Sequence, residues 1–368
     1  QILGHADPAV AAAVQAQLQK GVALGAATGI ESEIARAMCR RVDSLERIRF
    51  VNSGTEATLH AIRLARGFSQ KGKIAKFEGG YHGNHDAVEV SVAPPLDQAG
   101  PADAPYAVPT AGGISPSAAS EALILPFDDE EAVDKLVAAH ADELACVIFD
   151  PKCGVLETRP DFARAVREIT RRHDVLLIFD EIVAFRSAWG GLQAVYGIDP
   201  DLTCFGKVVG GGFPVGAFGG RADIMDLFDN SQGPTGFFQS GTFSAHPIAM
   251  AAGLATLEQM TAKNLDRLNG LGTRLKEGLD ALFAKQSIPA RTVCTGSVFS
   301  LYFSEGPVAS YRALAATDKA PLQPLFFSLL EQGYFLGQPG LGMCSLSLAM
   351  DESHIDGLVA AVHKGLAA

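Results

Sequence analysis

The sequence lacks several features that define whole classes of protein. No apolar run reaches the roughly 18 residues that a membrane-spanning helix needs, so none is expected. Charged residues make up 19 % of the 368 positions and hydrophobic residues 48 %, a balance that excludes intrinsic disorder. The formal net charge is −11 and no basic stripe stands out, which argues against nucleic acid as a partner, because phosphate binding needs clustered positive charge.

Paired-cysteine motifs and nucleotide-binding motifs are also missing. The six cysteines include no C-x-x-C pair, so neither a zinc site nor a redox motif is supported. This use of cysteine fits a reducing, cytoplasmic setting. There is no G-x-x-x-x-G-K-[S/T] loop and no G-x-G-x-x-G after a predicted strand, which argues against a dinucleotide-binding fold. The chain opens without Met and in mid-pattern, and we expect a preceding segment.

Short apolar runs alternate with helical stretches over the first two thirds of the chain. Continuous apolar runs predict strands buried on both faces, as in a parallel sheet. These runs are 47–51, 73–77, 145–150, 175–180, 202–206 and 215–219, and helices are predicted at 55–69, 129–139 and 160–172. The alternation predicts an α/β fold, with a mainly parallel central sheet flanked by helices.

The pattern changes after about residue 258. Helices at 263–285 and 320–332, strands near 297–304 and 344–350, and a last helix predict a smaller α+β domain. We therefore expect a large domain over 31–258, a small domain over 259–368, and residues 1–30 as the remnant of an N-terminal segment. The stretch 92–120, rich in Pro, Ala and Gly, is expected to be a functional or mobile loop.

Small and hydroxyl residues follow the first predicted strand. Backbone N–H groups at a helix start, together with the hydroxyls of Ser53 and Thr55, would form a cradle for an anion such as phosphate. Gly54 would let the backbone approach that anion closely. The alternative is an ordinary helix cap at Thr55, with Glu56 in the first turn.

A pair of acids and a lysine follow two later strands. Asp180 and Glu181 end the run 175–180, where ligands gather in an open parallel sheet, and a carboxylate there would pair with a cationic ring nitrogen or a metal. Lys207 follows the run 202–206 and precedes three glycines. A lysine in a partly buried site has a lowered pKa and acts as an amine nucleophile. The alternatives are a solvated strand end and an ordinary loop lysine.

A polar cluster follows the second predicted strand. Tyr81 and His82 would stack on or polarise an aromatic ligand. Alternatively, His82, His85 and Asp86, with Asp180, would bind a metal in a hydrolase, or the segment is only a polar turn.

Two further segments carry polar side chains. Ser240, Thr242 and Ser244 would supply a second phosphate contact. Arg186 would bind a substrate carboxylate or form a structural ion pair.

An anion cradle, an aromatic face, a carboxylate and a nucleophilic lysine are together what pyridoxal phosphate (PLP) requires. With these residues in this order, the sequence resembles the class III aminotransferases of PLP fold type I, in the branch that includes glutamate-1-semialdehyde 2,1-aminomutase. The resemblance covers nearly the whole chain. The most specific matches are Asn52–Ala57, Gly80–Gly83, Phe179–Val183 with Phe185-Arg186, Pro200–Thr203 with Gly206-Lys207, Gly210–Gly212, Gly219–Arg221 and Ser240–Phe243.

The resemblance implies a role for each residue and no metal. Lys207 would carry PLP as an aldimine and shuttle the proton, and Asp180 would pair with the pyridine nitrogen. The other cofactor contacts would come from Ser53, Gly54 and Thr55 at the phosphate, Tyr81, His82 and Ile182 or Val183 around the ring, and Thr242 at the phosphate of a neighbouring subunit. A homodimer with shared active sites is implied.

One departure concerns the cofactor ring. Asp150-Pro151-Lys152 stands where the family often has Glu-Pro followed shortly by Asn, so the ring oxygen would lose a hydrogen-bond partner.

The expected function is an aminotransferase that moves an amino group between an amino acid or amine donor and a keto acid. Glutamate-1-semialdehyde 2,1-aminomutase, which moves the amine within one molecule, is the alternative. It would be favoured by a lid at 92–120 or 232–239. An amino-acid racemase and a non-catalytic cofactor-binding module are the further alternatives.

Overall fold

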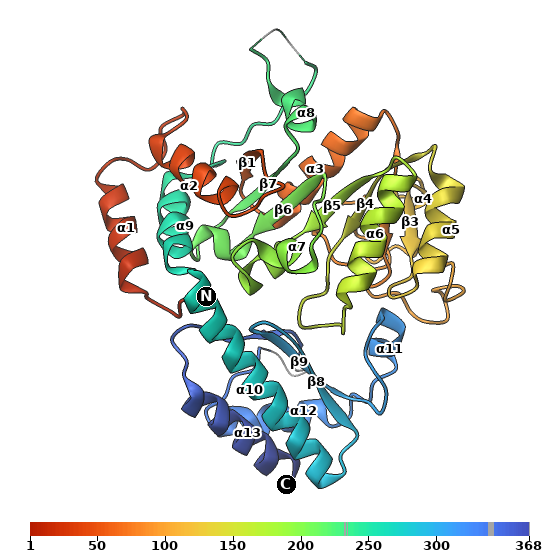
Figure 1. Cartoon of the computed structure of the whole chain (residues 1–368), viewed down its shortest axis with the longest axis vertical. Helices are drawn as coiled ribbons and strands as arrows, with labels where there is room; N and C mark the ends of the chain where they lie inside the picture. Colours follow the sequence, from red (N-terminus) through yellow and green to blue (C-terminus); the bar gives the residue numbers. More distant parts are fainter. Residues whose placement is uncertain (232, 234, 338–341, 368) are drawn as a thin grey trace.

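A seven-stranded sheet forms the upper part of the molecule in Figure 1. The computed structural model describes residues 1–231, 233, 235–337 and 342–367. The strands lie in the order β1-β7-β6-β5-β4-β2-β3. Their bounds are Arg47–Val51 (β1), Lys73–Phe77 (β2), Ala122–Leu125 (β3), Leu144–Phe149 (β4), Leu176–Asp180 (β5), Leu202–Gly206 (β6) and Gly216–Gly220 (β7).

The sheet is mainly parallel, with one reversed strand. β3, β2, β4, β5 and β6 pair in parallel, whereas β7 is antiparallel to both β1 and β6. β7 is rich in glycine, and a Cβ added at Gly216 would lie only 1.9 Å from the carbonyl oxygen of Ser53. These observations confirm the predicted α/β class, while the reversal of β7 had no signal in its apolar pattern.

Helices cover both faces of this sheet, because its central strands are apolar on both sides (Figure 1). All six residues of β4 are buried. α3 packs on one face and α5 and α6 on the other. The helices of this part are α1 (Pro8–Leu18), α2 (Gly29–Cys39), α3 (Gly54–Ser69), α4 (Pro116–Ser120), α5 (Glu130–His140), α6 (Pro160–Arg172), α7 (Gly191–Tyr196), α8 (Ala222–Met225) and α9 (Pro247–Gln259).

A second, three-stranded sheet forms the lower part of the molecule in Figure 1. Its antiparallel strands are β8 (Ala290–Thr295), β9 (Val298–Phe303) and β10 (Cys344–Ser345). They pack with α10 (Ala262–Gln286), α12 (Leu322–Glu331) and α13 (Glu352–Leu366), while α11 (Tyr311–Ala315) lies beside the larger sheet. β10 has two residues where a longer strand was predicted. The domain boundaries after residues 30 and 258 stay predictions.

Side-chain contacts join the two sheets. Arg312 of α11 forms an ion pair with Glu78, which follows β2, and both of its donor–acceptor distances are 3.0 Å. Arg312 also donates to backbone carbonyl oxygens of the segment after β2, including that of Gly100 (2.9 Å). The stretch 92–120 is thereby held against α11. It is largely irregular, as predicted, apart from α4.

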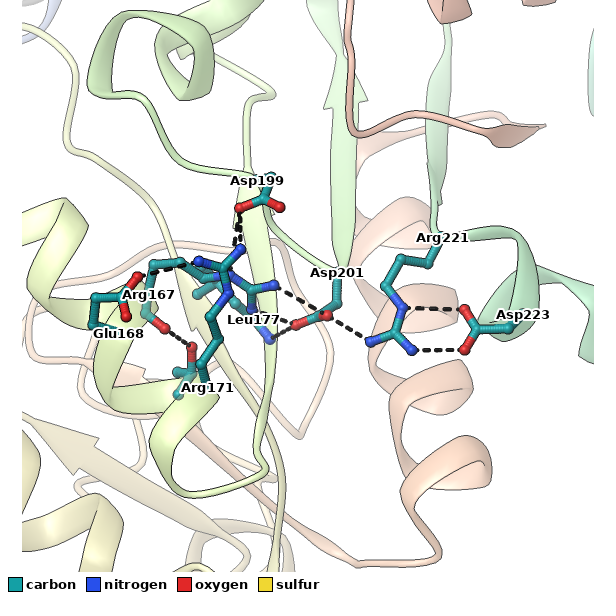
Figure 2. Close-up of polar contacts among 9 residues, drawn as sticks. Arg167, Glu168, Arg171, Leu177, Asp199, Asp201, Arg221 and Asp223 are labelled. Atoms are coloured by element: carbon teal, nitrogen blue, oxygen red, sulfur yellow. Dashed lines mark hydrogen bonds and ion pairs between the residues drawn. The ribbon is translucent and has the colours of Figure 1, made fainter.

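Figure 2 shows a buried ion network around Asp201, which directly precedes β6. Lys207 follows the other end of the same strand. Asp201 is 4 % exposed. Its carboxylate accepts hydrogen bonds from Arg167 (2.6 Å), Arg221 (2.8 Å) and the backbone N–H of Leu177 (2.8 Å). These donors come from α6, the end of β7 and β5. One carboxylate therefore sets the position of β6 against both of its neighbours.

The strand β3 was not predicted from the sequence. No helix in the ranges described is both long enough and apolar enough to cross a membrane. Of the second lid candidate, 232–239, Gln232 and Pro234 lie outside the described residues.

Candidate active site

The side chains predicted to act together meet at the carboxyl ends of the parallel strands. They line a cavity of about 490 Å³. Eight of the ten predicted site residues line it: Gly54, Thr55, Tyr81, His82, Asp180, Ile182, Val183 and Lys207. Ser53 and Thr242 do not. Parallel strands bring these positions together, because each strand ends at the same edge of the sheet.

Asp180 is the last residue of β5 and is buried, with 4 % exposure. One carboxylate oxygen accepts from the backbone N–H of Ile182 (3.1 Å), and the other lies 2.8 Å from Nδ1 of His82. Burial raises the pKa of Asp180 to about 6, against the lowering effects of the Ile182 N–H and the charge of Lys207. Within the described residues, no lysine or arginine forms an ion pair with Asp180.

His82 is a neutral partner to that carboxylate. Its side chain is fully buried, and burial, followed by the charge of Lys76, lowers its pKa to about 3. When Nδ1 donates to Asp180, the other nitrogen, Nε2, is an acceptor that is buried and has no partner among the described residues. His82 therefore orients the carboxylate without neutralising it. The sequence offered His82 as a ring or metal contact and gave no sign of this pairing.

Lys207 lies directly after β6, at the start of the turn η2 (Lys207–Gly210). Its backbone has φ +48°, in the left-handed region that few non-glycine residues adopt. Its side chain is exposed and lines the same cavity as Asp180. The strand end and the unusual turn together direct the amine into the cavity.

The start of α3 forms one wall of the cavity. Ser53, rather than Thr55, caps the helix, and its Oγ accepts from the N–H of Glu56 (3.1 Å). The N–H groups of Gly54 and Thr55 form no hydrogen bond in the part of the chain that the structure describes. Both residues line the cavity, so free backbone donors face it at the positive end of the helix dipole.

Flat and apolar side chains line other parts of the cavity. Tyr81 is 50 % exposed, and its hydroxyl donates to Asn84 (2.9 Å). Ile182 and Val183 follow Asp180 directly and line the cavity as well. Thr242 is exposed and lies in an irregular segment before α9.

The predicted metal alternative gains no support from the arrangement of these residues. Nε2 of His85 lies 3.3 Å from the Thr58 hydroxyl, and neither His85 nor Asp86 lines the cavity. Across the ranges described, no three His, Cys, Asp or Glu side chains gather as a metal site would need.

The segment after β4, which the resemblance placed near the cofactor ring, also lines the cavity through Asp150, Lys152 and Cys153. Nζ of Lys152 lies 3.6 Å from the Asp150 carboxylate, and both side chains are largely buried. Sequence reasoning missed other lining residues, among them Phe213 and Met343, which lie outside helices and strands and follow no local signal.

Glu181, the second acid of the predicted pair, does not line the cavity. It is buried and accepts from the N–H of Gln193 (2.9 Å), and burial raises its pKa to about 7. Its role in the structure is to hold the turn before α7.

Comparisons with known proteins identify the family of the chain. The chain matches the family described as "Aminotransferase class-III" over residues 1–362. It is 40 % identical over 365 residues to "Glutamate-1-semialdehyde 2,1-aminomutase 2" of Exiguobacterium sibiricum, covering 98 % of this chain and 81 % of that protein.

Solved structures show the same fold. An omega-transaminase from Sphaerobacter thermophilus superposes with a TM-score of 0.93 at 39 % identity, covering 100 % of this chain and 84 % of that one. A structure described as a transaminase with PLP bound has a TM-score of 0.88 at 31 % identity, covering 100 % and 84 %. These matches confirm the resemblance and the fold type that the sequence indicated, with PLP as the cofactor of the family, and the chain belongs to the class-III aminotransferases.

Proposed function

We propose that this protein is a PLP-dependent aminotransferase that moves an amino group between an amino acid or amine donor and a keto acid. The observation that carries the proposal is Asp180, a buried carboxylate that faces a cavity beside Lys207 and has no cationic partner among the described residues. A buried carboxylate is costly unless a cation pairs with it. A protonated pyridine nitrogen is such a cation.

The residues of the cavity fit PLP. The pyridine nitrogen would pair with Asp180, and the phosphate would accept from the free N–H groups of Gly54 and Thr55. Tyr81 and Val183 or Ile182 would cover the ring, and Lys207 would hold the cofactor through its amine. The phosphate contact assigned to Ser53 has less support, because its hydroxyl caps α3 and is outside the cavity lining.

Each side chain then has a definite task. Bound PLP supplies an electron-withdrawing ring that stabilises negative charge on the carbon next to the amine. With PLP bound, Asp180 would stay ionised and would keep the ring nitrogen protonated, and His82 would hold the orientation of the Asp180 carboxylate. Lys207 accepts the proton of the substrate carbon and returns it to another position, acting as general base and then acid.

A visible absorption spectrum of the purified protein tests this proposal. A yellow band is expected with PLP, and it should bleach with an amino donor and return with a keto acid. Lys207→Ala should not regain the band after donor treatment. Lys152→Ala, which changes another lysine of the same cavity, is the matched control and should keep the band. A colourless protein that takes up no added PLP would refute the proposal.

An aminomutase is the second candidate, favoured by relatives named glutamate-1-semialdehyde 2,1-aminomutase at about 40 % identity. The same residues would serve both reactions. Rearrangement of glutamate 1-semialdehyde with no keto-acid acceptor would identify a mutase. A strict need for an acceptor would identify a transaminase.

We also propose a cytoplasmic homodimer with shared active sites. All six cysteines are free thiols, which fits a reducing compartment. Thr242 is exposed and does not contribute to the cavity of its own chain, and the neighbouring Phe238 and Phe243 are 78 % and 57 % exposed. A second subunit packed on this segment would bury these rings and bring Thr242 to the partner's phosphate site. Sedimentation of the purified protein tests the dimer.

A further inference from the structure

Arg186 is a buried cation with only neutral partners. It lies in the turn Ala184–Ser187 (η1) after β5 and is 9 % exposed. Its Nε donates to the hydroxyl of Ser297 (3.2 Å), and Nη2 donates to the carbonyl oxygen of Leu346. In the part of the chain that the structure describes, Arg186 forms no ion pair, and Nη1 forms no hydrogen bond. The structural ion pair that the sequence left open is therefore not found there.

Such a site is unfavourable in the free protein. A guanidinium removed from water loses hydration that neutral oxygens only partly replace. Burial accordingly lowers the pKa of Arg186 to about 10. A bound carboxylate would offset this loss of hydration, because its two oxygens match the planar fork of N–H donors on arginine.

Arg186 lines a second cavity next to the active site. This cavity has a volume of about 400 Å³. It shares Lys207, Val183, Phe213 and Met343 with the first cavity, so the two are adjacent lobes that meet at the reactive amine. A molecule whose amine lies at Lys207 can extend into the second lobe, and its far end then meets Arg186.

The two lysines that line the lobes already have partners. Lys152 has the Asp150 carboxylate 3.6 Å away, and Lys207 is engaged by the cofactor in the proposed function. We propose that Arg186 binds a carboxylate of the substrate, so that the donors are amino acids rather than simple amines. This inference rests on the proposed function for the identity of the reaction.

The first test measures binding without chemistry. Glutarate, a dicarboxylate with no amine, is titrated into the PLP-loaded protein by calorimetry. Arg186→Gln should weaken binding roughly 10- to 100-fold, since hydrogen bonds to charged groups are worth about 1.5–3 kcal/mol. Arg186→Lys should lie in between. Ser297→Ala removes only the neutral partner of Arg186 and should stay within about threefold of the wild type.

The second test compares two donors that differ by one carboxylate. 3-Aminobutanoate and 2-aminopropane are each used to bleach the visible band of the loaded protein. Arg186→Gln should slow bleaching by 3-aminobutanoate at least roughly tenfold and leave 2-aminopropane unchanged. Equal losses with both donors, or equal glutarate binding by wild type and Arg186→Gln, would overturn the inference.

The two proposals fail in different ways. A wild-type protein that forms no visible band contradicts the proposed function. A protein that forms the band and transfers amino groups, but binds glutarate equally well without Arg186, contradicts only the carboxylate site. If Arg186→Gln does not fold, glutarate binding by Arg186→Lys is compared with that by Ser297→Ala. An equally large loss of affinity in both variants would mean that packing around Arg186, and not its charge, determines binding, and would overturn the inference.

Discussion

Asp180→Asn should make the cofactor-free protein more stable while abolishing amino transfer. The carboxylate is buried, and in the part of the chain that the structure describes its only side-chain hydrogen bond is to a neutral histidine. Asparagine has the same shape and no charge. Its carbonyl oxygen would accept from the N–H of Ile182, and its amide would donate to Nδ1 of His82 in the tautomer that carries its proton on Nε2. The substitution therefore removes the cost of a buried charge and keeps both contacts.

The size of the gain and its pH dependence follow from the pKa of Asp180. The folded pKa is about 6, against 3.8 for a free aspartate. Since the folded state holds its proton more tightly, the wild type loses stability as pH rises from about 4 to 6. A difference of about two pKa units corresponds to about 3 kcal/mol. Asp180→Asn should therefore exceed the wild type by up to about 3 kcal/mol at pH 8 and by about half as much at pH 5.

Urea unfolding of both cofactor-free proteins at pH 5 and pH 8 measures this difference. The same preparations, loaded with PLP, are assayed for bleaching by donor, which should be lost in Asp180→Asn. A variant that is equal to or less stable than the wild type at pH 8 would refute the reasoning. So would a gain that does not shrink at pH 5, because it would not come from the ionisation of Asp180.

Three further changes test other parts of the structure. Asp201→Asn leaves two arginines without their shared charge and should lower the free energy of unfolding by about 3–5 kcal/mol in urea. Asp199→Asn, whose side chain is 67 % exposed, should change it by less than about 1 kcal/mol, and similar values for the two would contradict the network. Gly216→Ala places a Cβ 1.9 Å from a backbone oxygen and should lower the free energy of unfolding in urea by about 2 kcal/mol or more. Gly270→Ala, its control, has open space around it in α10 and should raise that free energy by about 0.5–1 kcal/mol. Glu181→Gln should raise the free energy of unfolding clearly more at pH 8 than at pH 5, because burial raises the pKa of Glu181 to about 7; an equal gain at the two pH values would contradict this.

The fold was largely predictable where local signals were strong. The strands 47–51, 73–77 and 202–206 have the predicted bounds, because each has buried apolar residues near its end and is followed by a turn or helix signal. Helix 160–172 also has its predicted bounds, set by Pro160 at its first position. β3 was missed because four apolar residues have no periodicity of their own and become a strand only by pairing with β2. Strand direction, as in β7, depends on partners that a local pattern does not name.

The candidate site was predictable as a set of residues and not as a set of contacts. The positions of these residues after successive predicted strands were enough to predict that they meet, and eight of them line one cavity. The pairing of His82 with Asp180 joins positions 98 residues apart and needs the sheet order to place them. The neutral surroundings of Arg186 likewise depend on Ser297 and Leu346 of the smaller sheet.

Two buried aspartates at opposite ends of the same sheet show why one end is a site. Burial would raise the pKa of Asp201, but hydrogen bonds and charge from Arg167, with further help from Arg221, bring it below its usual value. Burial raises the pKa of Asp180 against the smaller lowering effects of the Ile182 N–H and the charges of Lys207 and Lys152, and among the described residues its side-chain hydrogen-bond partner is a neutral histidine. The chain therefore pairs its structural carboxylate with arginines and leaves the one beside Lys207 without an ion pair among the described residues. A cation supplied from outside the chain would offset the cost of this buried charge, which is the property that a site for a protonated ring must have.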